Sequence, residues 1–187
     1  MIFLSASIPI PGREFYGTED VVAIREAVMA FTKVCMEKHL PFYFGGHPAI
    51  TPLVWEVAKD YLHEEFKTLV HIYQSSWFLG NTPKEVEFYN NVVWTEAKDS
   101  ILESIEFMRN QMFRENKTTI AVFIGGMKGI MDEYDLITKY YSDVKILPIA
   151  TTGAASEKLY KDLGLNNSDL CDNYSYVSIF RKYLVNK

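Results

Sequence analysis

Residues 119–133 read Thr-Ile-Ala-Val-Phe-Ile-Gly-Gly-Met-Lys-Gly-Ile-Met-Asp-Glu, and the pattern of this segment indicates the fold class. Its first six residues form an almost continuous apolar run, which is typical of a parallel strand covered on both faces. Two glycines follow, and from Ile130 to about Tyr140 apolar residues recur at helical spacing. A strand, a glycine turn and a helix in this order predict one unit of a parallel α/β sheet.

The same alternation of short apolar runs and longer helical segments extends over the whole chain. We expect strands at residues 2–6, 41–44, 69–73, 91–94, 119–124 and 145–149, and helices at 18–39, 48–62, 83–89, 97–113, 130–140, from 151–153 to about 163, and 176–184. Helical crossovers between strands require a mostly parallel sheet with right-handed connections. The sequence therefore predicts α/β architecture, a Rossmann-like three-layer α/β/α sandwich, as a single domain over residues 1–187.

Composition narrows the class of protein. The chain has 187 residues and a net charge of −5, so we expect a globular protein without broad attraction to nucleic acid or to an anionic membrane. Cys35 and Cys171 stand far apart, no leader-like segment opens the chain, and no apolar run is long enough to span a bilayer. These features predict a cytoplasmic setting. Neither cysteines nor histidines show metal-ligand spacing, so we expect no metal and no cofactor.

Small residues follow several of the predicted strands. In an open parallel sheet these strand ends meet at one edge, where backbone N–H groups and helix N-termini favour phosphate. We infer a small phosphate-bearing ligand, with a nucleotide as the best fit. The predicted ligand-binding residues are Ser5, Ala6 and Ser7; Gly45, Gly46 and His47; Gly125, Gly126, Met127, Lys128 and Gly129; and Thr151, Thr152 and Gly153.

Three sets of side chains near these turns have alternative interpretations. Asp132 and Glu133 lie in the first turn of a predicted helix, where carboxylates interact favourably with the helix dipole. The same carboxylates could instead lie beside a ribose and stabilise an oxocarbenium-like centre. Trp77 and Phe78 could stack on a base or pack in the core, and His47 could contact the ligand or cap a helix.

The turn sequences carry a family resemblance. Residues 44–50 read Phe-Gly-Gly-His-Pro-Ala-Ile and combine with the Ile-Gly-Gly to Glu segment at 124–133. Together they resemble the SLOG superfamily, which includes LOG-type nucleotide phosphoribohydrolases and nucleotide-sensing domains of bacterial defence systems. Residues 3–9 (Phe-Leu-Ser-Ala-Ser-Ile-Pro) and 149–155 (Ile-Ala-Thr-Thr-Gly-Ala-Ala) are similar to its cluster-three branch.

The resemblance implies catalytic candidates, with departures from the enzyme pattern. LOG enzymes carry Pro-Gly-Gly-x-Gly-Thr-x-x-Glu with a catalytic glutamate. Here Ile124 replaces the proline, one residue is inserted before Gly129, and Ile130 replaces the threonine. Glu133 matches the glutamate approximately, and Asp132 is the other candidate. Arg109, in Met-Arg-Asn-Gln-Met at 108–112, resembles the arginine of the LOG segment Met-His-x-Arg-Lys, whose histidine and lysine are missing.

Three functions follow from these observations. The first is a sensor domain that binds a nucleotide or an NAD-derived ligand, as in antiphage defence, and forms a homo-oligomer with a separate effector protein as partner. The second is a phosphoribohydrolase that cleaves the N-glycosidic bond of a nucleoside monophosphate. The third is a scaffold that uses the fold without a ligand. The altered glutamate motif favours binding over catalysis.

Overall fold

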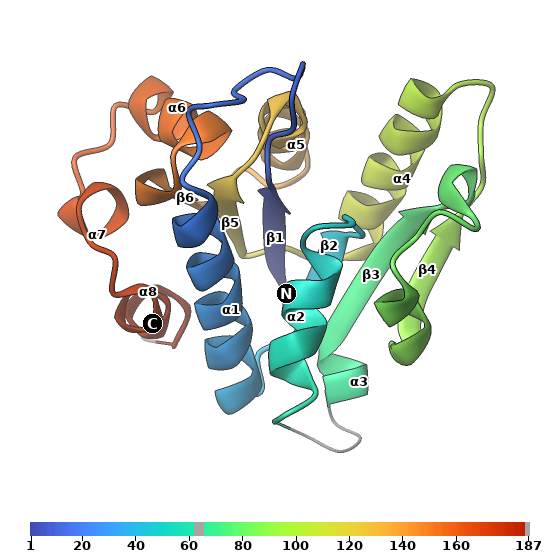
Figure 1. Cartoon of the computed structure of the whole chain (residues 1–187), viewed down its shortest axis with the longest axis horizontal. Coiled ribbons are helices and arrows are strands. Elements are labelled where there is room, and N and C mark those ends of the chain that lie inside the picture. The colour runs from blue at the N-terminus through green and yellow to red at the C-terminus, as the bar shows by residue number, and fades with distance from the viewer. Residues whose placement is uncertain (62–65, 186–187) are drawn as a thin grey trace.

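The centre of the molecule is a six-stranded sheet in the order β4-β3-β2-β1-β5-β6, in which every neighbouring pair is parallel (Figure 1). The structure is a computed structural model that describes residues 1–61 and 66–185. The strands are β1 (Ile2–Ser7), β2 (Phe42–Gly45), β3 (Val70–Ser75), β4 (Asn91–Thr95), β5 (Ile120–Gly125) and β6 (Lys145–Ile149). The predicted strands and the parallel sheet are confirmed.

Helices cover both faces of the sheet and complete the three-layer sandwich (Figure 1). The α-helices are α1 (Val21–Glu37), α2 (Thr51–Ala58), α3 (Phe66–Leu69), α4 (Ile101–Glu115), α5 (Lys128–Tyr140), α6 (Ala154–Asp162), α7 (Ser168–Cys171) and α8 (Tyr176–Phe180). Shorter turns are η1 (Ser76–Phe78), η2 (Lys84–Phe88), η3 (Ala150–Thr152) and the π-helical η4 (Arg181–Val185). One face packs against α1, α2 and α8, and the other against α4, α5 and α6. The Rossmann-like fold class is thereby confirmed.

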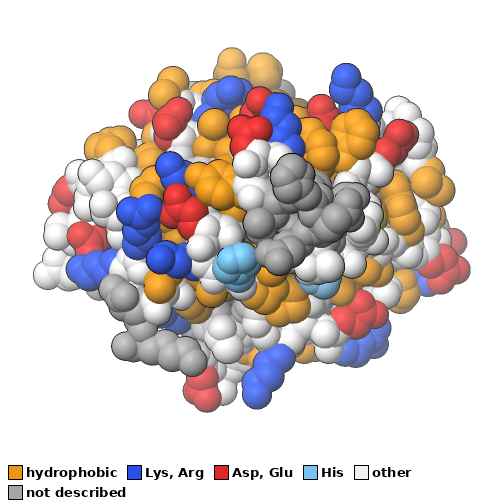
Figure 2. All heavy atoms as spheres, turned by 90° about the horizontal axis from the view of Figure 1, so that it is seen from below, with side chains coloured by type: hydrophobic (Ala, Val, Ile, Leu, Met, Phe, Trp, Pro, Cys, Tyr) orange, Lys and Arg blue, Asp and Glu red, His pale blue; other side chains and the backbone are white. Residues whose placement is uncertain are grey.

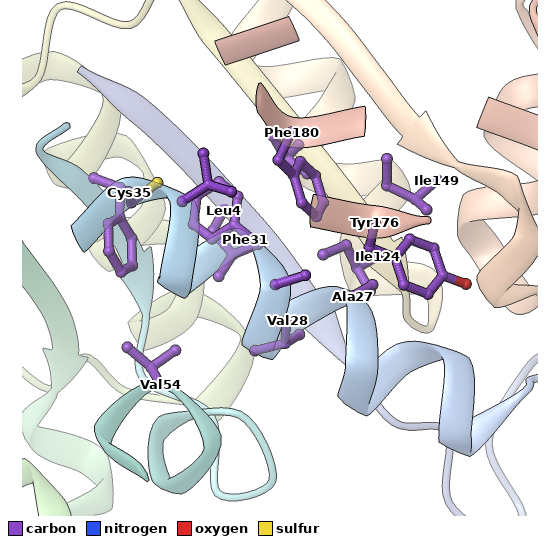
Figure 3. Close-up of a cluster of buried hydrophobic side chains, with 14 of the residues drawn as sticks. Leu4, Ala27, Val28, Phe31, Cys35, Val54, Ile124, Ile149, Tyr176 and Phe180 are labelled. Atoms are coloured by element: carbon purple, nitrogen blue, oxygen red, sulfur yellow. The ribbon is translucent and has the colours of Figure 1, made fainter. Parts of the chain in front are cut away.

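Alternation along the strands divides the core into two layers, as expected when a sheet is buried on both faces. Leu4 and Ile124 point toward α1, where Phe31 meets Phe180 edge-to-face with ring centroids 5.5 Å apart (Figure 3). On the other face, Phe3 packs against Phe113 of α4 with centroids 4.8 Å apart. Tyr176 and Phe180 of α8 are thus buried in this layer between α1 and the sheet.

Four predicted helix starts differ from the structure. The helix predicted from residue 97 begins at Ile101, and the one predicted from Ile130 begins at Lys128, so Asp132 and Glu133 do not lie in its first turn. Asp20, not Thr18, caps α1, because its carboxylate accepts from the Ala23 N–H at 2.9 Å, a geometry that satisfies an N-terminal donor of the helix. The helix predicted from residue 48 begins only at Thr51, with Pro52 in its first turn, and ends at residue 58. The end predicted for that helix, at residue 62, lies outside the described residues.

The strand order creates a topological switch point between β1 and β5. From β1 the chain continues through α1 to β2, whereas from β5 it continues through α5 to β6 on the other side. Such a divergence opens a crevice outside the carboxyl ends of the two strands, where ligands of α/β proteins bind. Figure 2 shows the opposite side, where acidic, basic and hydrophobic side chains are interspersed. In the described part of the chain, no helix combines the length and the apolarity that crossing a bilayer requires.

Candidate functional site

A cavity of about 330 Å³ lies at the carboxyl ends of the central strands. Its wall comes from the ends of β1, β2 and β3, from the segment after β3, from α4, and from the start of α5. The lining residues are Leu4, Ser5, Ala6, Ser7, Gly45, Gly46, His47, Pro48, Gln74, Phe78, Asn81, Thr82, Pro83, Ile105, Met108, Arg109, Met127, Gly129, Ile130 and Glu133. Three of the four predicted strand-end segments thus meet at one cavity.

The Glu133 carboxylate is held by two neighbours in the cavity wall. Its Oε1 accepts from Arg109 Nε at 3.0 Å, and its Oε2 accepts from Ser5 Oγ at 2.5 Å. The side chains of Arg109 and Glu133 are 16% and 15% exposed. Hydrogen bonds to a charged group in a partly dehydrated site are stronger than neutral ones. Three elements, β1, α4 and α5, are therefore joined around one carboxylate.

The Arg109 guanidinium has further protein partners. Its Nη2 donates to the Gly129 carbonyl at 3.1 Å, and its Nη1 lies 3.5 Å from Asp132 Oδ2. The Asp132 side chain is 48% exposed and is not part of the cavity wall. Of the two acidic candidates in the sequence, Glu133 is the one placed in the cavity. The positive charge of Arg109 is neutralised within the protein.

The glycine turn after β5 shapes the start of α5. Gly125 and Gly126 have φ angles of +58° and +90°, and a side chain at either position would collide with an isoleucine. Met127, the residue that precedes the helix, has no side-chain cap bond. The first N–H groups of a helix have no partner within the helix, so the backbone at Met127 to Gly129 is available to a ligand. Position 129 has little room for a side chain, because a Cβ there would lie 2.7 Å from Arg109 Nη2.

His47 contributes a neutral ring to the cavity wall. Burial lowers the pKa of His47 to about 4, so the imidazole is uncharged at neutral pH. Its Nδ1 accepts from the Ala49 N–H at 3.2 Å, which leaves the proton on Nε2. With His47 neutral and Arg109 paired with Glu133, the side chains of the cavity wall carry no net charge.

A comparison with models of known protein families identifies the family of this chain. A family model described as the SLOG cluster3 family matches residues 14–184. The chain belongs to the SLOG cluster3 family. A search of curated proteins gives no match. Membership supports a Rossmann-like, nucleotide-related domain and agrees with the resemblance seen in the glycine turns.

One predicted binding segment of this SLOG domain lies away from the cavity. Thr152 Oγ1 accepts from the Gly125 N–H at 2.8 Å and donates to the Ile149 carbonyl at 2.5 Å, so this hydroxyl supports the glycine turn. Gly153 pairs with Glu19 through a β-bridge. Thr151, Thr152, Gly153, Gly125, Gly126 and Lys128 are not among the residues that line the cavity. The small residues after β6 thus stabilise the loop that precedes α5.

Other residues of the SLOG cavity were not anticipated as ligand contacts. Gln74 is the next-to-last residue of β3, and a polar residue directly after Ile72 and Tyr73 was the available signal. Two further residues reach the cavity from α4: Ile105, one helical turn before Arg109, and Met108, which directly precedes Arg109. Trp77 is 43% exposed and lies outside the cavity wall, whereas Phe78 lines it. In the described residues, no group of three or more His, Cys, Asp or Glu could hold a metal ion.

Proposed function

We propose that this chain is a sensor domain that binds a nucleotide or an NAD-derived ligand at the switch-point cavity. The observation that carries the proposal is the position of the uncapped start of α5 at a cavity whose side chains have no net charge. Backbone N–H groups at a helix N-terminus favour a phosphate without a cationic side chain. The apolar remainder of the wall suits a planar ring.

The dimensions and the position of the cavity support a small ligand. A volume of about 330 Å³ falls within the range of small-molecule sites, about 300–1,000 Å³. In sheets of this type, ligands bind outside the carboxyl ends of the strands at the switch point. Residues from β1, β2, β3, α4 and α5 surround the same space, so a bound ligand would contact most of the central sheet edge.

Calorimetry with defined nucleotides tests this proposal. AMP, ADP, ADP-ribose and cyclic AMP are titrated into the protein, with adenosine as the control that lacks phosphate. We expect at least one phosphate-bearing compound to bind, and to bind at least tenfold more tightly than adenosine. A saturating ligand should also raise the free energy of unfolding by about 1–3 kcal/mol. The absence of heat and of thermal stabilisation with every nucleotide at millimolar concentration would reject the sensor proposal.

A second candidate function is a LOG-like phosphoribohydrolase. It is favoured by the Glu133 carboxylate in the cavity wall, held by Arg109 and Ser5. In this reaction the C1′–N bond breaks, the carboxylate stabilises the ribosyl cation, and water supplies hydroxide to C1′ and a proton to the base. Arg109 would orient the phosphate through its guanidinium.

Product analysis separates the two candidates. Incubation with AMP should release adenine and ribose 5-phosphate if the chain is an enzyme. Glu133→Gln should then abolish release, whereas Asp132→Asn is the matched control, because Asp132 lies outside the cavity wall. No release from the wild type rejects the hydrolase. Full release by Glu133→Gln would reject the role of this glutamate.

The sensor proposal includes partners for the chain. We propose that residues 1–187 act as one ligand-binding domain in the cytoplasm, form a homo-oligomer, and pass their signal to a separate effector protein, as in antiphage defence. Native mass spectrometry of the purified protein measures the subunit number and any retained nucleotide together. A monomeric mass at micromolar concentration would reject the homo-oligomer.

A further inference from the structure

Gln74 is a buried polar side chain in the cavity wall. It lies near the end of β3, where only 5% of its surface is exposed, and it follows the apolar residues 72–73. A buried carboxamide without partners is costly, because it loses its hydrogen bonds to water. Gln74 at this position therefore requires a compensating interaction.

The Gln74 carboxamide has no hydrogen-bond partner among residues 1–61 and 66–185. Within that part of the chain, Thr95 Oγ1 is the side-chain oxygen or nitrogen that is both fully enclosed and unpaired. Gln74 is unpaired without being fully enclosed, so its polar atoms retain some exposed surface, and the residue lines the cavity. Its donor and its acceptor are thus available to a molecule in the cavity.

Gly46 makes space for this carboxamide. A Cβ at position 46 would lie 2.0 Å from Gln74 Oε1 and 3.2 Å from Gln74 Cδ. Any larger residue at position 46 would displace the Gln74 amide. The position of the glutamine side chain therefore depends on the glycine after β2. Both residues line the cavity.

We propose that Gln74 is a specificity residue that reads the hydrogen-bonding edge of the ligand's ring, an inference that rests on the proposed function. A carboxamide presents one donor beside one acceptor. Adenine offers the complementary pair at its N6 amino group and N7, whereas guanine has two acceptors on the same edge. Phe78 and Met108, which also line the cavity, contact the faces of the ring.

The sheet geometry separates the ring from the phosphate. In the strand order, β3 and β5 are three positions apart, which corresponds to about 14 Å at the usual strand spacing. The phosphate lies at the start of α5, after β5, and the ring lies at Gln74. An extended nucleoside phosphate fits this span, so the two ends of the ligand are recognised by different strands.

Calorimetric titration of AMP, GMP, CMP and UMP into the wild type and three variants tests the role of Gln74. Gln74→Leu removes both polar atoms, and Gln74→Glu replaces the donor by a second acceptor. Gln111→Leu is the matched control, because the chain's other glutamine lies on α4 outside the cavity wall. Thermal unfolding and circular dichroism of each variant report its fold.

We expect Gln74→Leu to weaken AMP binding about tenfold or more, as one bidentate contact contributes on the order of 1–3 kcal/mol. Gln74→Glu should lower the ratio of AMP to GMP affinity at least tenfold, since a carboxylate has no donor for adenine N7 and accepts from the N1–H and N2 donors of guanine when the Watson–Crick edge of guanine faces residue 74. Gln111→Leu should bind as the wild type does. If Gln74→Leu does not fold, the AMP to GMP ratio of Gln74→Glu decides.

The outcomes distinguish this inference from the proposed function. A wild type that binds none of the four nucleotides overturns the role of Gln74, and it overturns the proposed function as well only if ADP, ADP-ribose and cyclic AMP also fail to bind. A wild type that binds a nucleotide, with unchanged affinities and an unchanged AMP to GMP ratio in the Gln74 variants, overturns the role of Gln74 alone.

Discussion

Removal of the Arg109 side chain tests the account of the cavity wall. Arg109→Met keeps the aliphatic part of the residue and deletes the guanidinium. Glu133 then loses its bond at Oε1 and keeps only the Ser5 hydroxyl, and the Gly129 carbonyl loses the donor at 3.1 Å. A carboxylate with only 15% of its side chain exposed is left without a counter-charge.

The magnitude follows from this burial. Breaking a fully buried ion pair costs about 3–5 kcal/mol. Because both side chains retain some contact with water, we reduce the expected loss to about 2 kcal/mol for Arg109→Met. Glu133→Gln keeps the shape and the contact with Ser5, so we expect a loss of about 1 kcal/mol. In a chain of this length, each kcal/mol lowers the melting temperature by about 2–4 °C.

A double-mutant cycle measures the pair directly. The free energy of unfolding is determined in urea for the wild type, both single variants and Arg109→Met with Glu133→Gln. We expect the double variant to lose about 1–2 kcal/mol less than the sum of the single losses. Arg114→Met, on the exposed side of the same helix, is the control and should change stability by less than about 0.5 kcal/mol. Additive losses within about 0.3 kcal/mol would refute the coupling.

Three further variants test the burial of His47, the support that Thr152 gives to the glycine turn, and the space that Gly46 leaves for Gln74. Burial lowers the pKa of His47 to about 4, below the usual 6.5. The unfolded chain therefore binds more protons than the folded chain between these two pH values, and the free energy of unfolding falls as the pH drops through this window. Between pH 7 and pH 4.5, urea unfolding should show a loss about 2 kcal/mol larger in the wild type than in His47→Asn, and equal losses would contradict this. Thr152→Val removes the acceptor of the Gly125 N–H and should lower the free energy of unfolding by about 1–3 kcal/mol; an unchanged melting temperature would argue against that support. Gly46→Ala places a Cβ against Gln74 and should weaken AMP binding about tenfold in calorimetry, while wild-type affinity would show that the amide can move without loss.

Much of the fold could be predicted from short-range patterns. The run at 119–124 is continuously apolar because both faces of β5 are covered, and the structure places that strand at Ile120–Gly125. The first residue of each helix was harder to predict from the sequence, because capping depends on backbone geometry. Asp20 and Thr18 are both good capping residues, and only the turn preceding α1 selects Asp20.

The candidate site was predictable where backbone conformation dictates sequence. The glycines that follow β2 and β5 indicate turns at which the backbone comes close to a ligand or to a neighbouring side chain. The role of Thr152 could not be deduced, because its partner Gly125 is 27 positions away and on another loop. Gln74 was missed because its significance depends on the space left by Gly46, which follows the adjacent strand β2.

Amide NMR spectra during a titration with AMP show where the phosphate and the ring of the nucleotide bind. Assigned ¹H–¹⁵N spectra report each backbone amide and the side-chain amides of both glutamines. We expect AMP to shift the amides of Met127, Lys128 and Gly129 and the side-chain amide of Gln74, whereas adenosine should leave the first three nearly unchanged. Shifts confined to other surfaces, or equal shifts with AMP and adenosine at the start of α5, would contradict a phosphate site there.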